Sequence, residues 1–199
     1  MNNPEQPYRA SQISLPLRSF IGSVYIPTFL IMLGYGMILP VIPLFAGELG
    51  AGLGLSGLVL SMHGIGSLLF DLPAGGLVAR FGEKRTMLAA SACTVLVAAA
   101  TGFSYSIIVL ALLTMAMGSL HALWMISVMS CLRRTIPQNR RGRGLSLVGG
   151  VFRISVFLGP IAGGLIGRDF GLRFSYFAQA LATAPAFLML LFSGHPLPP

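Results

Sequence analysis

The sequence predicts an all-α, polytopic membrane protein with six transmembrane helices and no substantial water-soluble domain. Only 9% of its 199 residues are charged and 55% are hydrophobic, whereas about a quarter of the residues in a soluble domain are charged. The mean hydropathy of +0.83 agrees. The apolar residues also gather into long runs separated by short basic or glycine-rich segments, and a helix of about 20 apolar residues is long enough to cross a bilayer.

Turn signals divide the apolar sequence into six spans. The first ends in Leu39-Pro40-Val41-Ile42-Pro43, where two prolines predict a bent or broken helix that neighbouring groups in a membrane protein can accommodate. The uncharged stretch from Thr86 to Leu132 is too long for one span, and Ser104-Tyr105-Ser106 supplies a turn within it. The expected spans are residues 20–45, 53–79, 86–103, 107–132, 145–167 and 174–192, between short tails at 1–18 and 194–199.

The basic residues predict the orientation of the chain in the membrane. Short loops on the cytoplasmic side of a membrane carry an excess of Lys and Arg. If the N-terminus is cytoplasmic, ten Lys and Arg residues lie on the cytoplasmic side, whereas only Arg168 and Arg173 lie on the opposite side. We therefore expect both termini in the cytoplasm, a plasma-membrane location and the lipid bilayer as a partner. Nucleic acid is not expected, because the basic residues lie between apolar runs instead of clustering on a folded surface with aromatic residues beside them. The ten basic residues expected on the cytoplasmic side are Arg9, Arg18, Arg80, Lys84, Arg85, Arg133, Arg134, Arg140, Arg141 and Arg143.

Two charged residues within the spans are candidates for a proton or substrate pathway. Asp71 lies roughly 12 Å from the cytoplasmic end of span two, at 1.5 Å per residue, on a stripe with Gly64, Ser67 and Gly75. A carboxylate in hydrocarbon is costly, so it should face the bundle interior or a water-filled cavity. Arg153 lies at a comparable depth in span five, and an ion pair between the two is a hypothesis.

Span four contributes two further candidates, His121 and Thr114, which share one helical face. An imidazole suits a proton relay because its ordinary pKa is close to neutral. His63 in span two is a weaker candidate. No cofactor and no metal site are expected, because Cys93 and Cys131 lie in apolar surroundings without metal-ligand spacing.

A catalytic alternative is weaker than a transport function. Gly54-Leu55-Ser56-Gly57 has the G-x-S-G pattern of rhomboid intramembrane proteases, but a serine nucleophile needs a histidine within hydrogen-bond reach. His63 is two turns away, roughly 10 Å along the helix, and His121 is expected in the inner half of span four. We therefore expect no enzyme activity and no catalytic residue.

Four segments resemble those of the major facilitator superfamily. The loop after span two is similar to its G-x-L-a-D-R-x-G-R-K signature, matching at five positions, although Ala79 replaces the aspartate and Glu83 the next arginine. Span five is similar to the G-P-x-x-G-G motif of proton-coupled antiporters. Residues 136–143 and 171–174 resemble the loop before span five and the entry to span six. The matching residues are Gly75, Leu77, Arg80, Gly82 and Lys84 in the loop, and Gly159, Pro160, Gly163 and Gly164 in span five.

The resemblance implies one six-helix half-bundle of the twelve-helix fold, the N-terminal one, with substrate held between two halves. It implies a transporter of a small, amphipathic or hydrophobic molecule. Proton-coupled efflux is the expected mode, so protons are the expected coupling ion. Such a half would work only as a homodimer or with a complementary six-helix half. A truncated or non-transporting fragment is the alternative.

Overall fold

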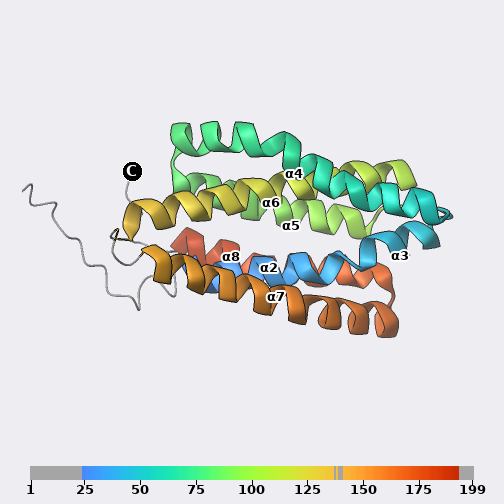
Figure 1. The fold of residues 1–199 in the computed structure, drawn as a ribbon. Helices are drawn as coiled ribbons and strands as arrows, with labels where there is room; N and C mark the ends of the chain where they lie inside the picture. Colours follow the sequence, from blue (N-terminus) through green and yellow to red (C-terminus); the bar gives the residue numbers. More distant parts are fainter. Residues whose placement is uncertain (1–23, 137, 139–140, 193–199) are drawn as a thin grey trace, which may run out of the picture.

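The computed structural model describes residues 24–136, 138 and 141–192, and this part of the chain is entirely helical, without strands. Residues 20–23 of the first expected span and both expected tails lie outside the described residues. The helices run nearly parallel or antiparallel to one another (Figure 1). They are α2 (Ile26–Ile38), α3 (Val41–Glu48), α4 (Leu53–Phe81), α5 (Glu83–Gly102), α6 (Ile107–Thr135), α7 (Arg141–Phe170) and α8 (Leu172–Phe192).

The helices account for six membrane spans when α2 and α3 are taken as one broken span. Five helices, α4 to α8, are each long and apolar enough to cross a bilayer, and α2 and α3 meet the same test together with a bend of 41°. The break falls at Pro40, directly before α3, because proline has no N–H to continue the helical hydrogen bonds. The predicted break in the first span is therefore confirmed.

Helices α4 and α6 are among those that continue past the ends expected from the apolar runs. Helix α4 ends at Phe81 and α6 at Thr135, so Arg80, Arg133 and Arg134 belong to last helical turns rather than to loops. Helical hydrogen bonding does not require apolar side chains, and an arginine can extend its charged end towards water while its stem remains beside apolar groups. The two helices therefore extend two and three residues beyond the expected span ends at 79 and 132.

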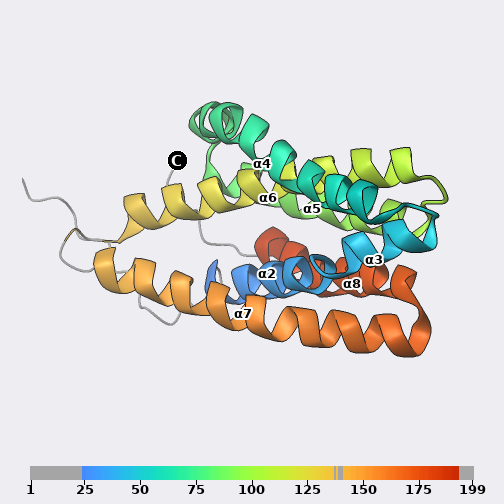
Figure 2. The same cartoon turned by 45° about the vertical axis from the view of Figure 1, so that its right-hand side comes forward.

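The bundle consists of two groups of three helices. Helices α4, α5 and α6 lie together in one group and α2, α7 and α8 in the other, as both views show (Figures 1 and 2). The most extensive packing is between α4 and α6, between α2 and α7, and between α5 and α8, which joins the groups. Helices α4 and α7 lie at opposite edges and are the least covered spans, with 22% and 17% of their most apolar windows buried, against 39% for α5, α6 and α8.

Glycines bring the backbones of α4 and α6 into direct contact. A Cβ atom on Gly66 of α4 would lie 1.9 Å from the carbonyl oxygen of Met115, and one on Gly118 of α6 would lie 1.9 Å from that of His63. Ser119 Oγ donates a hydrogen bond of 3.1 Å to the carbonyl of Gly66. Since lipid gives little hydrophobic drive to helix association, such close approach between small residues is a main source of packing energy.

We predict that Gly66→Ala destabilises the bundle, whereas Gly64→Ala two residues earlier does not. The new methyl group at position 66 meets the Met115 backbone, which cannot rotate away, while nothing lies within 4 Å of a Cβ atom at position 64. The expected cost is about 1–3 kcal/mol, typical of overpacking, measured as a lower thermal unfolding midpoint in detergent. Equal midpoints for the two variants would contradict the close α4–α6 contact.

Candidate functional site

Asp71 and Arg153 are both exposed on the surface of the six-helix bundle and do not form the ion pair that we considered from the sequence. Helix α4 packs on α6 and α7 packs on α2, so the helices that carry the two charges lie at opposite edges (Figure 2). The two glycines before Arg153, Gly149 and Gly150, face open space. Of the two environments expected for Asp71, the interior of this bundle is excluded.

His121 instead belongs to an interior aromatic cluster that joins three helices. Tyr35 of α2 stacks on His121 of α6 with ring centroids 4.1 Å apart. His63 of α4 lies 5.1 Å from Tyr35 and 5.9 Å from His121, centroid to centroid. His63 is only 6% exposed. The cluster thus lies where the two groups of helices meet.

Tyr35 was not among the residues predicted from the sequence, and His63 was predicted only as a weaker candidate than His121. The signal that was available is depth. Counted at 1.5 Å per residue from the first residue of each helix, His63 of α4 and His121 of α6 lie roughly 15 and 21 Å deep. Tyr35 lies at a similar depth, roughly 20 Å, when the broken span α2–α3 is counted back from its end at Glu48. Thr114, the other span-four candidate, is fully buried, and its hydroxyl has no hydrogen-bond partner in the described structure. It lies two turns from His121 and does not line the cavity beside the cluster.

A small cavity of about 20 Å³ adjoins the cluster. Two of the residues around it carry a buried polar atom that has no hydrogen-bond partner among the described residues, namely Nε1 of Trp124 and Oε1 of Gln179. Such atoms are uncommon in native proteins and call for an explanation. The polar and aromatic residues lining the cavity are Tyr35, His63, Thr94, His121, Trp124 and Gln179.

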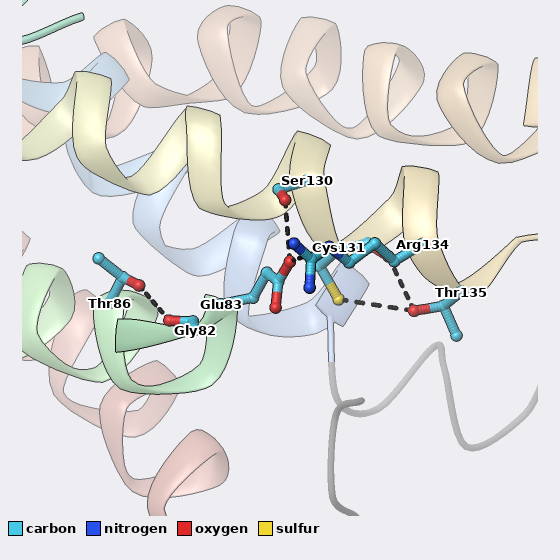
Figure 3. Close-up of polar contacts among 7 residues, drawn as sticks. All are labelled: Gly82, Glu83, Thr86, Ser130, Cys131, Arg134 and Thr135. Atoms are coloured by element: carbon cyan, nitrogen blue, oxygen red, sulfur yellow. Dashed lines mark hydrogen bonds and ion pairs between the residues drawn. The ribbon is translucent and has the colours of Figure 1, made fainter. Parts of the chain in front are cut away.

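The loop motif after span two forms a one-residue turn between α4 and α5. Gly82 has φ +82° and serves both as the last cap of α4 and the first cap of α5, a left-handed conformation that favours glycine. Its N–H donates to the carbonyl of Val78 at 2.9 Å, and the Thr86 hydroxyl donates to its carbonyl (Figure 3). The motif glycine therefore has a structural reason independent of any function.

The other loop-motif residues differ in their surroundings. Leu77 packs against the hydrophobic core, whereas Gly75 has open space around it. Arg80 is exposed and its guanidinium lies 5.5 Å from the ring centroid of Phe81. Lys84 is half-buried at the start of α5 and makes an interaction of its own. The loop motif therefore contains a residue packed on the core, Leu77, and an exposed residue, Arg80.

Glu83, which stands where the resembling family has an arginine, ties the loop to the end of α6. Its carboxylate is 2% exposed and lies 3.0 Å from Nε of Arg134. Ser130 Oγ donates a second hydrogen bond of 2.9 Å to the same carboxylate oxygen (Figure 3). A buried carboxylate requires such partners, so the loop, α5 and the end of α6 are held as one unit.

An open groove of about 590 Å³ lies between the ends of α4 and α6 at this side of the bundle. Pro73 lies inside α4, and beyond it α4 runs apart from α6 (Figure 1), as expected for a helix bent at proline. Apolar and small side chains line the groove, with arginines at its end. The lining residues are Gly75, Val78, Ala79, Met125, Ile126, Met129, Ser130, Arg133 and Arg134.

The span-five motif divides between packing and exposure. A Cβ atom on Gly159 would lie 2.6 Å from the backbone of Gly36, and one on Gly163 would lie 2.2 Å from the carbonyl oxygen of Met37. These two motif glycines therefore let α7 approach α2 closely, as small residues do between membrane helices. Gly164 faces open space, and Pro160 lies inside α7.

Ser56 does not meet the requirement for a serine nucleophile. It is buried at 7% exposure near the start of α4, and no histidine side chain of the described chain hydrogen-bonds to it. His63 and His121 contact Tyr35 and each other instead. Nothing in the geometry supports the protease alternative.

We predict that Glu83 and Arg134 are energetically coupled. Glu83→Gln keeps the shape of the side chain but removes its charge, and should lower the free energy of unfolding by about 1–3 kcal/mol, as expected for hydrogen bonds to a charged group. In a double-mutant cycle with Arg134→Gln, the double variant should lose less than the sum of the two single losses. Thermal unfolding in detergent measures both quantities.

The exposed pair Arg168–Asp169, joined at 2.8 Å, supplies the control for this cycle. Asp169→Asn should change stability by less than about 1 kcal/mol, because exposed ion pairs contribute little. Strict additivity of Glu83→Gln and Arg134→Gln would show that the buried contact has no energetic role.

Comparisons with known proteins agree with the geometry. The family model of the Major Facilitator Superfamily matches residues 24–199. The chain is 30% identical over 171 residues to the multidrug resistance protein MdtG of Citrobacter koseri, covering 82% of this chain and 41% of that protein. It is 31% identical over 123 residues to the tetracenomycin C resistance and export protein of Streptomyces glaucescens, covering 60% and 23%.

A solved structure shows the same fold. A crystal structure of the peptide transporter POT in complex with sulfate superimposes with a TM-score of 0.76 at 18% identity, covering 88% of this chain and 37% of that one. The chain spans about two-fifths of the length of MdtG. Its six apolar spans, its loop motif and the family match lead to one conclusion: this multi-pass membrane protein belongs to the Major Facilitator Superfamily.

Proposed function

We propose that the chain forms one half of a proton-coupled exporter of a small, amphipathic or hydrophobic compound. In this proposal it acts with a second six-helix unit, either another copy or a complementary half. The observation that carries the proposal is the position of Asp71 and Arg153 on α4 and α7, exposed on the two least covered spans. The relatives named for multidrug resistance and for export support the substrate class and direction.

The cost of charge in hydrocarbon favours a partner at this surface. A charged side chain at the centre of a bilayer costs about 2.5–3.5 kcal/mol on insertion scales, and neither Asp71 nor Arg153 is neutralised by an ion pair within the described chain. A second unit facing α4 and α7 would place both charges in a water-filled cavity between halves, which is the second environment expected for Asp71. Substrate would then bind between the units, as in transporters built from repeats.

The loop motif after span two and the glycine motif of span five lie at contacts that would let groups of helices move as units during transport. The start of α5 and the end of α6 are joined through Glu83 and Arg134. Gly159 and Gly163 of α7 pack directly on the α2 backbone, so the α2–α7 pair can move as a body. The ten-to-two distribution of basic residues supports cytoplasmic termini and a plasma-membrane location.

Substrate-driven proton movement in proteoliposomes tests the proposal. The wild-type protein, reconstituted as verified dimers or with its second half, should move protons when a transported drug gradient is applied. Asp71→Asn should lose this proton movement, because an amide cannot bind and release a proton. Asp169→Asn, which alters an exposed carboxylate at the end of α7, is the matched control and should keep it. If verified dimers and the assembled pair both move no protons, the chain is a non-transporting fragment.

Cysteine cross-linking tests the partner surface separately from transport. The background variant carries Cys93→Ala and Cys131→Ala. In it, we expect the cysteine of Leu72→Cys on α4 or of Phe157→Cys on α7 to cross-link the chain to its partner unit in membranes. These two positions are 89% and 71% exposed and lie on the proposed interface. Leu96→Cys on α5, 69% exposed, is the lipid-facing control and should remain uncoupled. Cross-linking at Leu96 alone would place the partner on the wrong surface.

A further inference from the structure

We propose that His63 and His121 together form a proton-binding site that holds one exchangeable proton, relayed through a single water molecule in the cavity beside Tyr35. The inference deepens the proposed proton coupling, on which its role in transport rests. The binding site itself is argued from the geometry of the bundle interior. It differs from the exposed Asp71, which lies two helical turns from His63 on the outer surface.

Among the described residues, the two imidazoles contact each other and Tyr35. The ring centroids of His63 and His121 are 5.9 Å apart, and neither side chain makes a hydrogen bond within the described structure. Tyr35 lies against both rings, at 5.1 and 4.1 Å between centroids. Each neutral imidazole has one N–H donor and one acceptor nitrogen. The two rings therefore provide donors and acceptors that no part of the described chain satisfies.

The adjoining cavity has the size and the lining for one water molecule. Its volume is about 20 Å³, and a space of roughly 10–15 Å³ or more can hold a water if two to four polar groups surround it. Trp124 and Gln179, which line it, are 1% and 3% exposed, and each carries a polar atom without a partner. A water at this position would bridge imidazole nitrogens and complete these hydrogen bonds.

The charge balance sets the number of protons at one. The helices around the cavity contribute Tyr35 from α2, His63 from α4, Thr94 from α5, His121 from α6 and Gln179 from α8. None of these is a carboxylate or a permanent cation. Uptake of a proton converts one neutral imidazole to imidazolium, and release restores it. A second proton would place two positive charges close together without a counter-ion, which is strongly unfavourable in a low-dielectric interior.

The site is placed to connect protonation with helix movement. Its rings come from α2, α4 and α6, and they meet between the α2–α7–α8 group and the α4–α5–α6 group. An imidazolium beside Tyr35 gains a cation–π interaction with the phenol ring. Protonation therefore changes the contact between the two groups of helices, which is what coupling to a conformational change requires.

The fluorescence of Trp124 tests proton binding directly. Trp124 is the single tryptophan of the chain and lines the same cavity as both histidines, and a protonated imidazole quenches indole emission more strongly than a neutral one. In detergent-solubilised protein we expect the Trp124 emission intensity to change reversibly with pH. The curve of intensity against pH should fit the binding of one proton. His63→Gln and His121→Gln should each alter it, and the double variant should abolish it.

Two controls make the result specific. His195→Gln alters the third histidine of the chain and Ser61→Ala alters an exposed residue on the same helix as His63. Both should leave the emission change as in the wild type. An emission change that persists in the double variant, or that disappears with His195→Gln, would overturn the site.

Nuclear magnetic resonance of ¹⁵N-labelled histidine gives the same test on the wild-type protein, without relying on variants that fold. We expect the His63 and His121 signals to change together, with one proton taken up between them. Two independent protonations, or no protonation of either ring, would overturn the proposal.

The transport assay separates this site from the proposed function. A proton titration of Trp124 emission without any drug-driven proton movement would leave the site standing and reject the exporter. Drug-driven proton movement that survives in the His63→Gln, His121→Gln double variant would keep the exporter and reject the site as its coupling centre.

Discussion

The close contact of glycine with the backbone of a neighbouring helix is the constraint on which the rest of this structure depends. Gly118 of α6 lies against the carbonyl of His63, one helical turn from His121, so the contact that joins α4 to α6 also brings the two histidines together. On α2, Gly34 packs against Gln179 and Gly36 packs against the backbone of α7. Tyr35 lies between these two glycines, and the same contacts fix its position. A methyl group at these crossings would separate the helices and open the cluster.

Close packing on some faces leaves others uncovered. Because α4 packs through Gly66 against α6 and α7 packs through Gly159 and Gly163 against α2, other faces of both helices carry exposed leucines and phenylalanine. Asp71 and Arg153 lie among these exposed residues. Lipid can cover the apolar side chains, but it cannot solvate the charges. The same helix packing that makes the interior compact therefore leaves the charges of Asp71 and Arg153 exposed on α4 and α7.

The sequence predicted the number of spans and the break at Pro40, because each follows from local chemistry: apolar length and a missing N–H. It could not predict which face of α4 turns inward. Asp71 and His63 lie eight residues apart on one helix, yet His63 is buried and Asp71 is exposed. The polar stripe with Gly64 and Gly75 suggested an inward face, whereas the inward side is the one on which Gly66 meets α6.

The Glu83–Arg134 contact shows why a motif position cannot be interpreted from its own residue alone. Taken by itself, Glu83 places a negative charge in a basic loop, where the family signature has an arginine. In the structure its carboxylate is buried and paired with an arginine one helix away, so the charge is balanced by a group 51 positions later in the chain. Since a buried carboxylate without a partner would be strongly destabilising, the two positions are constrained together. The loop keeps its link to the end of α6, and the outward-facing residues Arg80 and Arg133 remain available at the edge of the bundle.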